Sequence, residues 1–301
     1  MKEVRWVDNL KVRLGYGVTG NQDVIAPYNS LALYAPNGVT SVNGVNTTTY
    51  AIQSNDNPDL KWEVKHTFGI DFAAFQNRLN VTLDWYTSKT KDLLYTYTVP
   101  VPPFTYNTLL ANMGEMTNSG FEIGVRGDII RTKDFTFNSG MNLSFQKNKL
   151  NSLSGTYKGQ RLTTSEHIPV ANINAAGLTQ NTGVTYLMEG QPIGVFYLPH
   201  CKGIDDKGQY IIEDLDKNGT IDTGDSGDRK VCGQAIPKAY LGWDFTFKYK
   251  NWDLTMQFNG AFGHKIYNGT GMTYSNLSNF PTYNVLSDAP EKGIKDIQIS
   301  D

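Results

Sequence analysis

The sequence predicts an all-β protein, folded as an antiparallel meander of about seven long strands. Apolar and polar residues alternate with a period of two in one stretch after another, which gives each strand one apolar and one polar face. Aromatic residues make up 12% of the 301 residues, charged residues only 19%, and 29 residues are glycine. This composition favours strands over helices, because aromatic side chains pack well on a pleated surface.

The clearest strand pair is the stretch from Phe121 to Phe145. Its first arm alternates Phe121, Ile123 and Val125 with polar residues or glycine. The chain turns at residues 131–133, and the second arm then alternates large apolar residues with polar ones as far as Phe145. That arm is longer than the roughly five or six residues of an ordinary soluble strand. It is long enough to cross a bilayer at a tilt, which takes about 9–11 residues.

Five further stretches show the same alternation. One stands near the start of the chain, two form a hairpin closed by a tight turn, and two form a last hairpin. In chain order, these stretches are residues 10–16, 68–72, 79–86, 243–249 and 252–262.

The connections between the expected strands are alternately short and long. Compact soluble domains seldom contain structureless loops beyond about 12–15 residues, whereas short turns at one rim and long loops at the other are typical of an outer-membrane β-barrel. A soluble β-sandwich, which also alternates, is the alternative architecture. Tight turns are expected at residues 76–78, 131–133 and 250–251, and long loops at residues 19–62, 99–116 and 149–236.

Charge and hydropathy exclude several classes of protein. The net charge of −2 offers no basic surface for nucleic acid. No run of about 18 apolar residues is present, which excludes a transmembrane helix but not a barrel, whose strands show only every second residue to lipid. Seven strands do not close a single-chain bacterial barrel, which has an even number, and no signal peptide opens the chain. We therefore expect the chain to be one part of a longer barrel.

Motifs at the strand ends resemble one family of membrane transporters. Gly15–Gln22 (GYGVTGNQ) closes the first strand, and Asn57–Glu63 (NPDLKWE) precedes the second. The motifs occur in the family's order, cover nearly the whole chain, and together resemble the SusC/RagA family of TonB-dependent outer-membrane nutrient transporters. The others are residues 77–86 (NRLNVTLDWY), 89–94 (KTKDLL), 112–122 (NMGEMTNSGFE), 189–197 (EGQPIGVFY) and 237–242 (PKAYLG).

The resemblance implies a fold, a location and partners. Residues 1–301 would form part of a 22-stranded barrel of the bacterial outer membrane, without the plug domain and the last strands. Turns would be periplasmic and loops extracellular, with residues 149–236 as a long loop insertion. The implied activity is import of an oligosaccharide or peptide with a SusD-like surface lipoprotein, driven by TonB through the N-terminal part that is missing here. Four polar residues are expected to face the lumen: Arg126, Asn142, Asp244 and Asn259.

An acidic loop at residues 214–225 has the spacing of a calcium-binding loop. Calcium takes six to eight oxygen ligands on a loop that bends sharply. Loop positions 1, 3 and 5 are acidic or amide residues, Gly219 provides the bend, and position 12 is Asp in place of the Glu of an EF-hand, so we expect weak binding. The alternative is an ordinary surface loop rich in Asp, Asn and Gly. The expected ligands of Ca²⁺ are Asp214, Asp216, Asn218, Thr220 (through its carbonyl), Asp222 and Asp225.

Other candidate chemistry is sparse. Cys201 and Cys232 bracket the acidic loop and are candidates for one disulfide bond. The four histidines have no metal-binding spacing and no catalytic motif is present, so the sequence predicts no enzyme. The rival interpretation is a soluble secreted β-sandwich protein that binds calcium and glycan.

Overall fold

The computed structural model describes residues 9–23, 25–76, 78–173, 182–205, 210–222, 224, 227–275, 280, 282, 284–287 and 289. The chain divides into two compact units. The sheet unit comprises Met1–Ser165 and Ala239–Ala261, and the loop unit comprises Glu166–Lys238 and Phe262–Asp301. Among the described residues, no helix has the length and apolar character that crossing a membrane would require.

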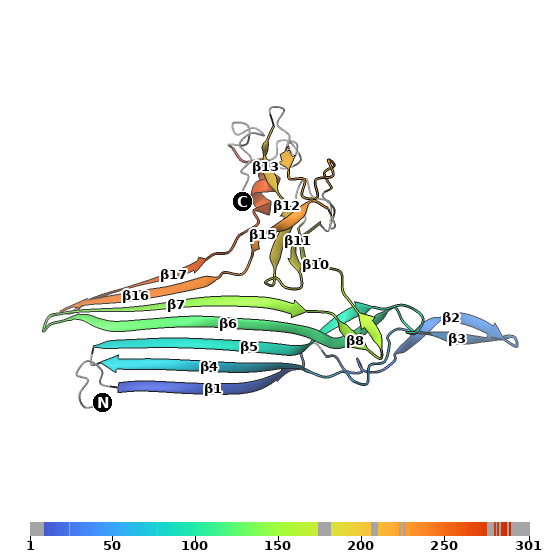
Figure 1. Cartoon of the computed structure of the whole chain (residues 1–301), viewed down its shortest axis with the longest axis horizontal. Coiled ribbons are helices and arrows are strands. Elements are labelled where there is room, and N and C mark those ends of the chain that lie inside the picture. Colours follow the sequence, from blue (N-terminus) through green and yellow to red (C-terminus); the bar gives the residue numbers. More distant parts are fainter. Residues whose placement is uncertain are drawn as a thin grey trace. The chain divides into compact units, whose positions relative to one another are not determined.

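One seven-stranded antiparallel sheet forms the frame of the sheet unit (Figure 1). Its strands lie side by side in chain order, and smaller elements are inserted between some of them. This arrangement confirms the predicted all-β meander. The strands are β1 (Asn9–Asn21), β4 (Glu63–Gln76), β5 (Leu79–Thr98), β6 (Thr108–Arg131), β7 (Phe135–Ser152), β16 (Ala239–Tyr249) and β17 (Trp252–Phe262).

Several strands are much longer than the alternation predicted. β5, β6 and β7 have 20, 24 and 18 residues. The loop expected at residues 99–116 is therefore wrong in its second part, because β6 begins at Thr108. Here Leu109 and Leu110 are adjacent, and the register between β5 and β6 shifts at Leu93, so the period of two is lost. The first residues of the loops expected at 19–62 and 149–236 likewise belong to β1 and β7.

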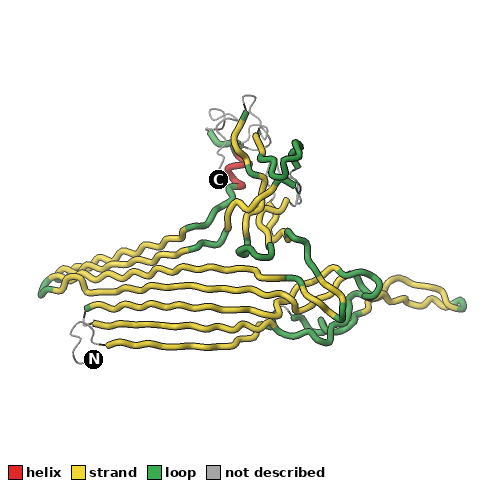
Figure 2. Tube along the Cα trace, in the orientation of Figure 1, coloured by secondary structure: helices red, strands yellow, loops and turns green. Residues whose placement is uncertain are grey.

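The tight turns all lie at one end of the seven-stranded sheet, and the long connections leave from the other end (Figure 1, Figure 2). Residues 132–134 join β6 to β7, and residues 250–251 join β16 to β17. At the opposite end, residues 22–62 connect β1 to β4, and residues 99–107 connect β5 to β6. Within the sheet unit, the predicted separation of short turns from long loops is confirmed.

The strand register gives the sheet one apolar and one polar face. Trp85 of β5 stands opposite Phe121 of β6, which in turn stands opposite Phe145 of β7. One position along each strand, the aligned side chains are polar, because successive side chains point to opposite faces. That neighbouring row runs through Arg13, Asp71, Asp84, Glu122 and Ser144.

The last hairpin follows the same division. Phe258 of β17 packs on Phe245 of β16 with ring centroids 5.8 Å apart. The hydroxyls of Thr246 and Thr255, from the other face of the same two strands, lie 3.1 Å apart. The alternation expected for β17 is therefore confirmed.

The long connections of the sheet unit carry their own small elements. β2 (Tyr34–Val42) and β3 (Val45–Ile52) form a hairpin, as do β8 (Gly155–Tyr157) and β9 (Gln160–Leu162). Asn55 fixes the first connection to the second: its amide donates to the carbonyls of Tyr106 (2.6 Å) and Thr108 (2.7 Å). A buried cluster holds this end together, with Tyr97, Val99, Leu109, Ala111, Tyr157 and Leu162.

The loop unit contains short strands that the alternation did not predict. A four-stranded sheet is formed by β10 (Ile168–Ile173), β11 (Thr182–Leu187), β12 (Val195–Pro199) and β15 (Arg229–Gln234). β13 (Cys201–Ile204) and β14 (Tyr210–Ile212) form a hairpin, and α1 (Gly269–Tyr274) is a short helix. The core of this unit is small and is built from Tyr186, Val195 and Tyr197.

Candidate functional site

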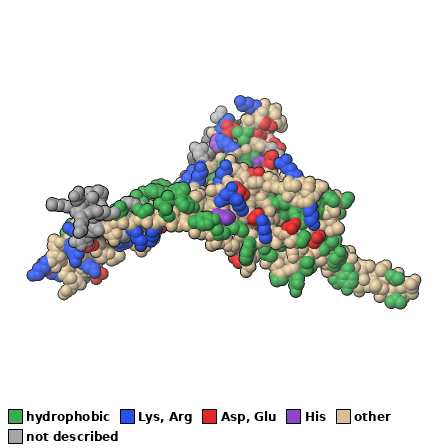
Figure 3. All heavy atoms as spheres, turned by 60° about the horizontal axis from the view of Figure 1, so that its bottom comes forward, with side chains coloured by type: hydrophobic (Ala, Val, Ile, Leu, Met, Phe, Trp, Pro, Cys, Tyr) green, Lys and Arg blue, Asp and Glu red, His purple; other side chains and the backbone are tan. Residues whose placement is uncertain are grey.

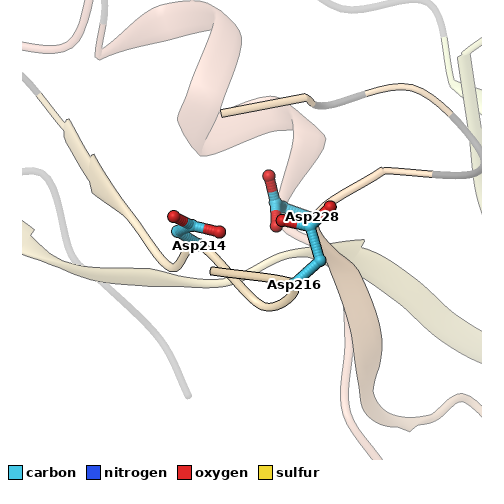
Figure 4. Close-up of side chains that lie close together, drawn as sticks. All are labelled: Asp214, Asp216 and Asp228. Atoms are coloured by element: carbon cyan, nitrogen blue, oxygen red, sulfur yellow. The ribbon is translucent and has the colours of Figure 1, made fainter. Parts of the chain in front are cut away.

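Three aspartates come together at the two ends of the acidic loop (Figure 4). Asp214 follows β14, Asp216 comes two residues later, and Asp228 directly precedes β15. One carboxylate oxygen from each residue lies within 4.8 Å of the others. Oxygen ligands without histidine or cysteine suit calcium or magnesium better than zinc.

Asp214 is the carboxylate on which the loop folds. Its Oδ2 accepts a hydrogen bond from the backbone N–H of Gly219 (2.9 Å), and Gly219 has a φ of +83°, as a sharp bend requires. That N–H lowers the pKa of Asp214, which is therefore ionised at neutral pH. Its Oδ1 is buried and has no hydrogen-bond partner among the described residues. A buried anionic oxygen of this kind is costly unless a cation or water meets it.

Asp216 and Asn218 shape the middle of the loop. Asp216 Oδ1 accepts from the backbone N–H of Asn218 (3.1 Å), and Asn218 Oδ1 accepts from that of Thr220 (2.7 Å). These are Asx turns, in which a side chain replaces a backbone acceptor two residues away. Both residues are exposed, so the loop holds its shape mainly through its own hydrogen bonds.

Asp228 is the functional candidate that the sequence interpretation missed. It is only 3% exposed, and it accepts hydrogen bonds from the backbone N–H groups of Leu215 (2.7 Å) and Asp222 (2.9 Å). EF-hand spacing placed the last ligand at position 12, Asp225, which lies outside the described residues. The structure does not bring Asp222 into the three-aspartate group; its Oδ1 accepts from the N–H of Gly224 (2.8 Å). The available signal was an acidic residue directly before the next strand.

Glu213 is next to the three aspartates in sequence, but it serves another purpose. Its Oε2 lies 2.7 Å from Lys230 Nζ and 2.9 Å from His200 Nδ1, and its Oε1 lies 3.2 Å from Lys202 Nζ. Hydrogen bonds from Lys230 and Lys202 lower the pKa of Glu213 to about 2. This carboxylate ties β14 to β13 and β15 and is already satisfied by cations of the protein.

The two cysteines are free thiols in the structure. Cys201 Sγ donates to the carbonyl of Gly203 (3.1 Å), and Cys232 Sγ donates to that of Lys230 (3.4 Å). The expected disulfide bond is therefore not formed: the cysteines lie on β13 and β15, in different sheets, and each thiol turns to its own segment. Burial raises the pKa of the Cys232 thiol, which keeps it protonated.

The four residues expected to face a lumen share the polar face of the seven-stranded sheet. Arg126 of β6 and Asp244 of β16 both stand opposite Gly140 of β7, and they form an ion pair of 2.6 Å. Asn142 stands opposite Gly242, two residues along in each strand, and Asn259 Oδ1 approaches the same glycine from β17. Polar side chains and glycines thus alternate across this face.

The opposite face of the sheet carries large apolar side chains that remain open on the surface, where hydrophobic side chains gather in Figure 3. On β1, Leu14 is 72% exposed and Tyr16 is 69% exposed. On β17, Trp252 is 80% exposed. A patch of this kind marks a surface that contacts lipid or another protein.

Comparison with known proteins identifies the family. Residues 4–261 match the family model described as "TonB dependent receptor-like, beta-barrel". "TonB-dependent receptor P3" of Formosa agariphila is 31% identical over 100% of this chain and 31% of its own length. "TonB-dependent receptor SusC" of Bacteroides thetaiotaomicron is 28% identical over 89% of this chain and 26% of its own length.

Solved structures show the same fold. The RagAB peptide importer in the "open-open" state superposes with a TM-score of 0.67 and 25% identity, over 88% of this chain and 27% of that chain. A second structure of the RagAB peptide transporter gives a TM-score of 0.66. The chain thus spans under a third of the length of the relatives it matches. With its seven-stranded sheet of one apolar and one polar face, it belongs to the TonB-dependent receptor-like β-barrel family.

Proposed function

We propose that this chain forms part of the wall and the extracellular loops of a TonB-dependent nutrient importer in the bacterial outer membrane. The observation that carries the proposal is the two-faced sheet, whose apolar face is exposed on strands such as β1 and β17. In a bilayer, lipid would cover that face, and the polar face would line a lumen. The 22-stranded barrel of the family would be completed by strands outside this chain.

The proposed mechanism is passage of a solute, with no bond made or broken. The ion pair of Arg126 and Asp244 and the amides of Asn142 and Asn259 would present donors and acceptors to a polar solute or to a plug. The names of SusC and of the RagAB peptide importer support an oligosaccharide or a peptide as the solute. They also support a SusD-like lipoprotein as the partner at the loops and TonB as the source of energy.

We also propose that the three-aspartate loop binds Ca²⁺ as a structural ion. The geometry in support is the convergence of Asp214, Asp216 and Asp228, together with the partnerless buried Oδ1 of Asp214. A divalent cation would relieve the repulsion among these carboxylates and would order the segment between β14 and β15. We expect weak binding, about 10⁻⁴–10⁻³ M, the range of extracellular calcium modules.

Cysteine labelling in intact cells tests the proposed function. In the complete protein, with Cys201 and Cys232 replaced by Ser, Ser41→Cys on β2 and Lys133→Cys at the turn after β6 are compared, since both residues are exposed. A membrane-impermeant maleimide should label Ser41→Cys directly, and Lys133→Cys only after the outer membrane is opened.

Equal labelling of the two positions in intact cells would refute the orientation. Recovery of the protein in the soluble fraction without detergent would refute the membrane location and support the soluble β-sandwich.

A further inference from the structure

Four lysines project from the apolar face of the sheet, at the side of the long connections. We call Lys89, Lys91, Lys147 and Lys149 the lysine belt. Lys89 stands opposite Thr117 of β6, and Thr117 stands opposite Lys149 of β7. Lys91 lies two residues beyond Lys89, and Lys147 two residues before Lys149, so all four side chains leave the same face.

The lysine belt begins where the aromatic row ends. Phe145 belongs to the row of Trp85 and Phe121, and Lys147 is the next residue of β7 on that face. A strand rises about 3.4 Å per residue, which puts the two Cα atoms roughly 7 Å apart along the strand. In a membrane barrel, an aromatic row marks the depth of the lipid head groups. The lysine belt would therefore lie at head-group level and on the lipid side of the wall.

The positive charge of the lysine belt is largely uncompensated. Its one acidic neighbour, Glu115, pairs with Lys89 at 2.7 Å and stands opposite Lys91. Lys147 and Lys149 are exposed, and they form no ion pair among the described residues. Two unpaired ammonium groups on successive outward positions, beside Phe145, which is 45% exposed, fit an amphiphile with an anionic head.

We propose that the lysine belt binds the phosphate groups of phosphorylated lipid head groups in the leaflet that surrounds the long-connection end of the barrel. Lysine is a compact point charge with three donors, which suits phosphate oxygens. The acyl chains of the same lipid would cover the apolar rows next to the lysine belt. The inference rests on the proposed function, because it requires the sheet to stand in a bilayer.

Lipid binding to the complete protein in detergent micelles tests the inference. The probes are diphosphoryl lipid A and the same lipid without its phosphates, and native mass spectrometry gives the dissociation constants. The test variant is Lys147→Gln with Lys149→Gln. The matched control is Lys65→Gln with Lys248→Gln, which removes the same charge from exposed positions on the polar face of the sheet.

We expect the wild type to bind the phosphorylated lipid more tightly than the phosphate-free lipid. A lysine near an anionic lipid surface contributes about 1 kcal/mol, which is about fivefold in affinity, so the test variant should bind the phosphorylated lipid about 25-fold more weakly. Added salt should reduce this difference, and the control variant should match the wild type.

Three outcomes would overturn the inference. Equal affinity of the wild type for both lipids would remove the role of phosphate, and an equal loss in the control variant would remove the role of the lysine belt. Either result leaves a protein in the detergent micelle and so leaves the proposed function intact. A wild type that stays monodisperse without any detergent would refute the proposed function, and the inference with it.

Discussion

Arg126 and Asp244 are joined across an intervening strand. The Arg126 guanidinium passes over Gly140 of β7 and meets the Asp244 carboxylate of β16 at 2.6 Å. A Cβ atom built on Gly140 would lie 2.5 Å from Arg126 Nη2, so only glycine leaves room for the contact. The ion pair therefore depends on a residue that takes no part in it.

Gly140→Ala should displace the guanidinium and break the ion pair. We expect a loss of about 1 kcal/mol in the free energy of unfolding, since exposed ion pairs contribute up to about 1 kcal/mol and the guanidinium must also move. Urea unfolding of the complete protein in lipid vesicles measures it. Gly15→Ala is the matched control, because nothing lies within 4 Å of a Cβ there. Equal costs at the two glycines would contradict the steric account.

The two faces of β17 predict opposite tolerance to charge. Met256→Arg should destabilise the barrel by about 2–4 kcal/mol if the residue lies at the bilayer midplane, whereas Gln257→Arg should cost much less because it faces the polar side. Folding in vesicles, followed by urea titration, gives both values. The assignment of the faces fails if the two substitutions cost the same.

The calcium proposal predicts a loss of binding on substitution at one exposed ligand. Asp216→Ala should abolish the binding of calcium at millimolar concentration in calorimetry and should increase protease cleavage between residues 205 and 232. Asp59→Ala, an exposed aspartate of the sheet unit, is the control. Asp228→Asn should have a similar effect on binding, since a neutral amide is a weaker ligand.

A wild type that binds no calcium at millimolar concentration would end the calcium proposal. An Asp225→Asn variant that loses binding, while Asp228→Asn keeps it, would restore the EF-hand spacing in place of the three-aspartate group.

Glu213 predicts a stability that falls in acid. Its pKa is lowered from 4.5 to about 2 in the folded protein, so the unfolded chain binds the proton first as the pH falls. The stabilisation is therefore fully present above about pH 4.5 and is lost as the pH falls towards 2. Glu213→Gln should flatten this dependence.

The reaction of the half-buried Cys232 thiol with an aromatic disulfide, in a Cys201→Ser background, reports the opening of the loop unit over this pH range. The same acid profile in wild type and Glu213→Gln would show that another group is responsible.

Sequence reasoning predicted those parts of the fold in which one physical rule acts alone. Residues 121–126 and 252–262 alternate because one face is apolar and the other polar, and both are strands of the seven-stranded sheet. The rule failed at residues 108–116, where Leu109 and Ala111 are buried by neighbouring connections and a shift of register interrupts the pattern. Strands of three to six residues in the loop unit are too short to show a period.

The candidate site was predictable to a similar extent. Asp214, Asp216 and the bend at Gly219 follow from local spacing, because they lie within one turn of chain. Asp228 was missed because its place depends on where β15 begins, which brings it back to Asp214 from 14 residues away. The ion pair between Arg126 and Asp244 was equally out of reach, since it depends on a strand register that no local pattern specifies.

Quenching of a fluorophore by brominated lipid tests the central claim, that one face of this sheet meets the bilayer. Single cysteines at residues 253–259 of β17 would be labelled in the complete protein, with Cys201 and Cys232 replaced by Ser, and reconstituted in vesicles. The account predicts strong quenching at Leu254, Met256 and Phe258 and weak quenching at Thr255 and Gln257 between them. Uniform quenching along the strand, or none at any position, would contradict it.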